Sequence, residues 1–197
     1  MLPLLLGMLV FVGIHLLPAQ PDIRRGLVTR YGDGAYKAFF SLVSAVGLGM
    51  IIFGYHKAQV MPGKNLQLWG PPVWGRHVTM LLMLPVFPLL LAAYLPGRIK
   101  AVVRHPMITA VMLWALGHLF VRGDAASLLL FGGLLAWAIF DRISLNRRGV
   151  SPPVEIQNGP LTPVLMFDFI TVGLGLSFYL TMLKWGHQAL IGVKLIP

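Results

Sequence analysis

The stretch AVVRHPMITAVMLWALGHLFVRGDAASLLLFGGLLAWAIFDR, residues 101–142, decides the fold of this chain. Two apolar runs, 106–121 and 124–141, meet at the polar triplet RGD of residues 122–124. Each run approaches the roughly 20 apolar residues that a helix needs to cross the hydrocarbon core of a bilayer. Because their connection is so short, the two runs are predicted to form a tight helical hairpin within a membrane.

The rest of the sequence has the same apolar character. Of its 197 residues, 57% are hydrophobic and 11% are charged, whereas soluble domains carry about 25% charged residues. Further apolar segments cover 1–17, 36–56, 77–96 and 165–191, and Pro85 and Pro88 predict a kink in the third. We therefore predict an all-α, polytopic integral membrane helical bundle of about six transmembrane helices, with residues 1–197 forming a single domain.

The formal net charge of +10 comes from basic residues in short loops between apolar segments. This placement fits a role in orienting the protein in the lipid bilayer and argues against a nucleic-acid partner. With six spans, one side holds ten of the basic residues: Arg24, Arg25, Arg30, Lys37, Arg98, Lys100, Arg104, Arg142, Arg147 and Arg148. The positive-inside rule then predicts an inner (cytoplasmic) membrane protein whose two termini face outward.

Several kinds of chemistry are excluded by composition. The chain has no cysteine, which rules out disulfides, thiolate catalysis, iron–sulfur clusters and covalently attached haem. Its six acidic residues are scattered, which argues against a cage for hard cations. No serine–histidine–aspartate set, glycine-rich phosphate loop or His-x-x-x-His spacing stands out. The catalytic residues, if any, are therefore unknown, and the histidines become the candidates.

Three of the six histidines lie in or beside apolar segments. His15 ends the first segment and His118 lies near the far end of the fourth, where an ionisable residue is by default a functional candidate. His105 follows Arg104 and opens the fourth segment, with Pro106 at the first helical position. Arg104 and His105 are both candidate cofactor-binding residues, because an arginine beside this helix start could bind an anionic group. The others, His56, His77 and His187, are predicted to be residues of the membrane interface.

Helix geometry limits how these histidines can cooperate. His105 and His118 lie about 20 Å apart along one helix and about 140° around it, so they cannot ligate the same metal. Two imidazoles from separate helices would suit the iron of a haem. Predicted depth places His15 near His105, on the side opposite His118, so the pairing of His15 with either residue stays open.

The first, second, fourth and fifth segments carry motifs of a known family. GIHLLPA (13–19), YKAFFSLVSAVGLGMIIFGYH (36–56), RHPMITAVMLWALGHLFVRG (104–123) and AWAIFDRISLNRRG (136–149) together resemble the NnrU family, which includes the zeta-carotene isomerases. The resemblance implies an integral membrane protein. For the isomerases it implies haem b on two histidines, matching His15 and His118 here, and for bacterial members it implies a link to nitrite and nitric oxide respiration.

This sequence departs from the isomerases in two places. Met107 replaces the glutamine that follows their Arg-His-Pro, and FGGLLAW (131–137) lacks their tandem histidine. The RHP motif is also similar to that of isoprenylcysteine-type methyltransferases, although Ile108 and Ala110 replace their tyrosine and glycine. The main hypothesis is a haem-binding protein with a redox or ligand-sensing role linked to nitrogen-oxide respiratory proteins. The alternatives are a membrane enzyme on a lipid-soluble substrate and a non-catalytic assembly factor.

Two stripes of small residues predict where helices pack closely. Ser41, Ala45 and Gly49 share one face of the second segment. Gly173, Ser177 and Thr181 share one face of the last. Small residues let helix backbones approach one another in membranes, so both faces are expected to pack within the bundle. The oligomeric state cannot be read from the sequence.

Overall fold

The computed structural model describes the chain except for residues 62, 64, 151–160 and 197. Within the described residues it is a bundle of helices, with one isolated bridge between Gln67 and Asp124. Five helical segments are long and apolar enough to cross a membrane: Leu2–Ala19, Asp33–Val60, Gly75–Ala92, Ala125–Arg147 and Leu165–Ile191. The prediction of an all-α polytopic membrane bundle is confirmed.

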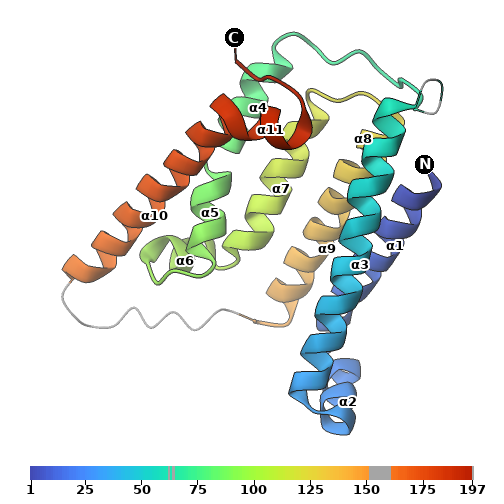
Figure 1. Cartoon of the computed structure of the whole chain (residues 1–197). Coiled ribbons are helices and arrows are strands. Elements are labelled where there is room, and N and C mark those ends of the chain that lie inside the picture. The colour runs from blue at the N-terminus through green and yellow to red at the C-terminus, as the bar shows by residue number, and fades with distance from the viewer. Residues whose placement is uncertain (62, 64, 151–160, 197) are drawn as a thin grey trace.

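Helices α1 (Leu2–Leu16) and α3 (Asp33–Val60) form a closely packed pair at one edge of the bundle (Figure 1). Their backbones approach at Gly47 and Gly54 of α3. A Cβ atom on Gly47 would lie 2.8 Å from the backbone nitrogen of Phe11, and one on Gly54 would collide with the backbone of Leu4. Glycine is required at both positions because a larger residue would push the two membrane helices apart.

The predicted small-residue faces are wrong in both helices. Ser41, Ala45 and Gly49 are exposed, and no other element lies within 4 Å of a Cβ built on Gly49. The contact in α3 instead uses Gly47, two residues earlier than Gly49. Two residues correspond to about 200° around a helix, so the true face lies on the opposite side.

The same offset occurs in α10 (Leu161–Thr181). Gly173 has open space around it, whereas a Cβ on Gly175 would lie 2.5 Å from the backbone nitrogen of Pro88 in α5. Ser177 and Thr181 donate hydrogen bonds to carbonyls of their own helix, so their hydroxyls are already satisfied there.

The third apolar segment is broken, as its prolines predict. Helix α4 (Gly75–Met83) ends before Pro85, and α5 (Val86–Ala92) begins after a turn at Leu84 and Pro85. The segment ends at Ala92 rather than at residue 96, and the short helix α6 (Arg98–Val103) follows. Asp168 of α10 accepts hydrogen bonds from the first backbone N–H groups of α6, which anchors this turn to the last span.

The predicted hairpin of the fourth and fifth segments is present. It consists of α7 (Pro106–Leu119), a turn, α8 (Ala125–Ser127), the π-helical segment η2 (Leu128–Gly132) and α9 (Gly133–Arg147). Helix α7 has only 14 residues, about 21 Å of helix. It is packed between two hydrophobic clusters, with Ala110 buried in one and Ala115 in the other.

The bundle has two different ends. Both termini lie at one end with α11 (His187–Ile191), which follows the π-helical segment η3 (Met182–Gly186) (Figure 1). We call this the Asp124 end. The other end holds α6 and α2 (Pro21–Tyr31), a helix in the loop where the sequence analysis recognised only arginines. We call it the basic end.

Candidate functional site

His15 lies in a group of aromatic side chains near the basic end of α1. Its Nδ1 lies 2.6 Å from the carbonyl oxygen of Phe11. Its ring centroid is 4.2 Å from that of Phe11, 5.2 Å from Phe40 and 5.4 Å from Trp137. A carbonyl can only accept, so Nδ1 carries the proton and Nε2 of the neutral ring presents a lone pair. This is the arrangement in which histidine acts as a metal ligand.

His118 has the same local arrangement in α7, near the Asp124 end. Its Nδ1 donates to the carbonyl oxygen of Trp114 at 2.7 Å, which again leaves Nε2 free. Its ring stacks on Phe131 with centroids 4.6 Å apart and planes 17° apart. Phe131 belongs to η2, and π-helical segments are frequent at functional sites.

The structure does not bring His15 and His118 to one depth. His15 packs beside Trp137, whereas His118 stacks on Phe131, which precedes Trp137 by six residues on the same helical hairpin arm. Six residues correspond to about 9 Å along a helix. Each imidazole fits haem iron in its donor chemistry. For both histidines to bind one iron, α7 would have to tilt or slide relative to α1, so that the two rings come to the same depth.

His105 occupies a strained turn at the start of α7. Arg104 has φ 63° and ψ −49°, and the N–H of His105 donates to the carbonyl of Val103 at 2.7 Å. This is a γ-turn of the rare, strained form, and such strain is found at functional sites. Arg142 of α9 holds the turn by donating to the carbonyl of Val103 at 3.0 Å and to Thr109 Oγ1 at 3.3 Å.

The surroundings of His105 disfavour the protonated form of its ring. Burial lowers the pKa of His105, and the positive charge of Arg142 lowers that pKa further. Its Nε2 is buried and has no hydrogen-bond partner within the part of the chain that the structure describes. Arg104, the other residue predicted for this site, has an exposed side chain. The ring is therefore available as a neutral donor or acceptor.

His15 and His105 share the basic end, as their predicted depth requires. Asp141 of α9 interacts electrostatically with both rings and with Arg148. Arg148 in turn donates to the carbonyl of Pro18, just beyond the end of α1, at 3.1 Å. Asp141 was not among the predicted site residues, although an acid at the end of a membrane span is a signal for function.

A second polar centre, at Asp124, escaped the sequence analysis. Its buried carboxylate accepts hydrogen bonds from Gln59 at 3.0 Å, from Asn65 at 2.7 Å, and from the N–H and hydroxyl of Ser127 at 2.9 and 2.7 Å. Burial alone would raise the pKa of Asp124, but the hydrogen bonds from Asn65, Ser127 and Gln59 hold it below the ordinary value. The hydroxyl of Tyr55 lies 2.9 Å from that of Ser127, and this hydrogen bond adds Tyr55 to the network.

The Asp124 network fastens a long loop to the hairpin turn. Leu68 donates to the carbonyl of Gly123 at 2.7 Å, and Ala125 donates to the carbonyl of Leu66 at 2.9 Å. The polar groups of this network hydrogen-bond to one another. We therefore interpret the network as structural.

Of the remaining histidines, His56 and His77 have exposed side chains, whereas His187 lies close enough to His118 to interact with it electrostatically. His187 Nδ1 donates to the carbonyl of Val193 at 2.9 Å, within the C-terminal turn. Among the described residues, no three histidine, aspartate or glutamate side chains come together as a metal-binding group. Two-histidine ligation of a haem iron is a different arrangement and needs no third protein ligand.

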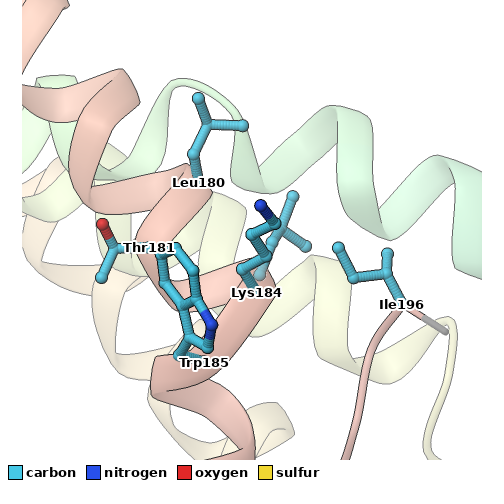
Figure 2. Close-up of a pocket in the computed structure, with 6 residues that line it drawn as sticks. Leu180, Thr181, Lys184, Trp185 and Ile196 are labelled. Carbon is cyan, nitrogen blue, oxygen red and sulfur yellow. The ribbon is translucent and has the colours of Figure 1, made fainter.

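A pocket of about 350 Å³ lies at the Asp124 end, between the last span and the C-terminal tail (Figure 2). The ammonium group of Lys184 lies 5.0 Å from the ring of Trp185 at this site. The lining residues are Leu180, Thr181, Leu183, Lys184, Trp185 and Ile196. None of the residues predicted for the haem site lines this pocket.

Comparison with known proteins agrees with the motifs found in the sequence. No curated protein and no solved structure matches the chain. The family described as NnrU protein matches residues 3–195, almost the whole chain. The protein is therefore a member of the NnrU family.

Proposed function

We propose that this protein binds haem b within the membrane and has a redox or ligand-sensing role linked to nitrite and nitric oxide respiration. The observation that carries the proposal is the state of His15. Its Nδ1 is engaged by the carbonyl of Phe11, its Nε2 is free, and aromatic rings surround it. A porphyrin requires such apolar, flat surroundings and a lone pair directed at the iron.

His15 is proposed as one axial ligand. His118 is the second ligand implied by the family resemblance, and its own hydrogen bond to Trp114 supports this role. His105 is the alternative second ligand, because it lies at the same end of the bundle as His15. When bound, the haem would supply one-electron chemistry or an iron site for a small ligand such as nitric oxide.

The chain's own residues would set the properties of such a site. The carbonyls of Phe11 and Trp114 orient the two rings and raise their basicity as ligands. Phe131 and Trp137 cover them from water. In the proposed orientation the basic end faces the cytoplasm and both termini face outward, and the partners are proteins of nitrogen-oxide respiration.

The test is an absorption spectrum of the protein purified in detergent after expression with sufficient haem. We expect a Soret band that disappears in His15→Ala and in one of His118→Ala and His105→Ala. His56→Ala serves as a matched control and is expected to keep the band. A folded wild-type protein without a Soret band would refute the proposal. Loss of the band in all variants alike would show that the histidines act through folding.

The orientation has its own measurement. A reporter enzyme active only in the cytoplasm is expected to be silent at either terminus and active when inserted beside Arg147. The reverse pattern would contradict the proposed orientation without touching the haem proposal.

A further inference from the structure

Three buried polar side-chain atoms lack a hydrogen-bond partner among the described residues: Tyr36 Oη, His105 Nε2 and Trp137 Nε1. Buried polar groups are nearly always paired, because an unpaired one loses its hydration without compensation. Tyr36 is only 8% exposed, so water does not satisfy its hydroxyl freely. Each of these atoms therefore calls for a physical explanation.

Two of these three residues are connected to His15 by aromatic contacts, Trp137 directly and Tyr36 by way of Phe40. The ring of Trp137 lies 5.4 Å from that of His15. Tyr36 lies 6.3 Å from Phe40, whose ring is 5.2 Å from His15. His105 is linked to His15 through Asp141, which interacts electrostatically with both. We call His15, Tyr36, His105 and Trp137 the inner cluster.

The hydrogen-bond donors of the inner cluster require a ligand that accepts hydrogen bonds. The indole N–H of Trp137 can only donate, and the Tyr36 hydroxyl can also donate, since no described residue hydrogen-bonds to it. A ligand that satisfies both must present oxygen atoms with free lone pairs.

The positive charge of nearby arginines favours a ligand that is an anion. The guanidinium of Arg24 lies 5.8 Å from the Tyr36 ring, Arg148 is held at Pro18, and Arg142 lies beside His105. Of the acids at this end, Asp141 interacts with Arg148, and Asp22 and Asp33 form ion pairs with Arg25 and Lys37. Arginine binds carboxylate strongly because it offers parallel N–H donors.

We propose that the inner cluster binds a carboxylate of a membrane-embedded ligand, with Tyr36 and Trp137 as hydrogen-bond donors and Arg24 as the nearby cation. Neighbouring side chains cover the donors, so the ligand reaches them when those side chains turn aside. Two sources carry this group: the propionates of a haem on His15, a case that rests on the proposed function, and a free fatty acid from the bilayer.

The experiment compares acids with their methyl esters on the full-length protein in lipid nanodiscs. One arm uses haem and haem dimethyl ester, and the other uses oleic acid and methyl oleate. The wild type is expected to prefer the acid by about tenfold or more in at least one arm, since hydrogen bonds to charged groups are strong. Tyr36→Phe with Trp137→Phe is expected to reduce that preference to below about threefold.

Two further variants keep the result interpretable. Tyr55→Phe removes a hydroxyl at the Asp124 end and is expected to retain the full preference. Tyr36→Phe alone gives a second, less disruptive test if the double variant does not fold, and its fold is checked by circular dichroism.

The arms separate the two proposals. A preference for haem over its ester identifies the propionates, and a preference confined to oleic acid identifies a free lipid acid. If haem does not bind, the proposed function fails while the oleic acid arm still decides the inference. Equal binding of acid and ester in every arm that binds would overturn it, as would an unchanged preference in a folded Tyr36→Phe, Trp137→Phe variant.

Discussion

The two ends of the bundle treat buried polar groups in opposite ways. At the Asp124 end, the carboxylate, Asn65 and Ser127 all find partners within 3.0 Å, and the loop is fastened to the hairpin. At the basic end, Tyr36 and Trp137 bury polar atoms that have no hydrogen-bond partner in residues 1–150 and 161–196, so far as these are described. A satisfied network stabilises one structure, whereas unsatisfied donors store free energy that a ligand can recover. The comparison separates a structural centre from a binding centre.

The largest expected effect is at the Asp124 end. Asp124→Ala leaves the buried N–H and hydroxyl of Ser127, and the amides of Asn65 and Gln59, without their acceptor, and we expect the free energy of unfolding to fall by about 3 kcal/mol or more. Thermal unfolding in detergent, followed by circular dichroism, measures the change. Asp22→Ala is the control, because Asp22 forms only an exposed ion pair with Arg25. Equal losses in the two variants would contradict the structural role of the network.

A pair of tyrosine variants tests the contrast between the ends directly. Tyr55→Phe loses the hydrogen bond to Ser127 and is expected to cost about 1 kcal/mol of unfolding free energy. Tyr36→Phe removes a buried hydroxyl that has no partner, so ligand-free protein is expected to be unchanged or more stable by up to about 1 kcal/mol. Destabilisation by Tyr36→Phe as large as by Tyr55→Phe would show that Tyr36 is satisfied.

Acid should weaken the Asp124 end selectively. The hydrogen bonds keep the pKa of Asp124 below its ordinary value despite burial. Its stabilising contribution is therefore complete above the unfolded pKa of about 3.9 and is lost as the pH falls through the lower folded pKa. Unfolding measured from pH 6 to pH 3 should show this loss in the wild type and a flatter profile in Asp124→Asn. Parallel profiles would count against the assignment.

The smallest effect is expected at His105. Burial, and then the charge of Arg142, lower the pKa of His105, so protonation is harder in the folded state than in the unfolded chain. Stability should then decline as the pH falls below about 6.5, where only the unfolded chain gains the proton. His105→Gln should remove this decline between pH 8 and pH 5, and His56→Gln should keep it. The measurement is the midpoint of thermal unfolding at each pH.

Local pattern was enough for much of the fold. Runs of apolar residues predict the membrane spans, the short RGD connection predicts the hairpin, and Pro85 predicts the break between α4 and α5. Helix α2 was not predicted, because its polar sequence has no apolar run. None of its residues is buried in the structure. The candidate histidines could be named from the sequence, because an imidazole in an apolar segment is unusual.

The sequence by itself determined that this chain is a helical membrane protein, because a long apolar run is stable only where bilayer covers it. Only the tertiary structure decided which helix faces meet. Gly47 and Gly49 are the same residue type in the same helix, and they differ only in the side of the helix on which they lie. It also decided that Asp124 is paired while Tyr36 and Trp137 are not. Hydrogen bonds between residues some sixty positions apart depend on how helices pack, and helix packing cannot be read from local pattern.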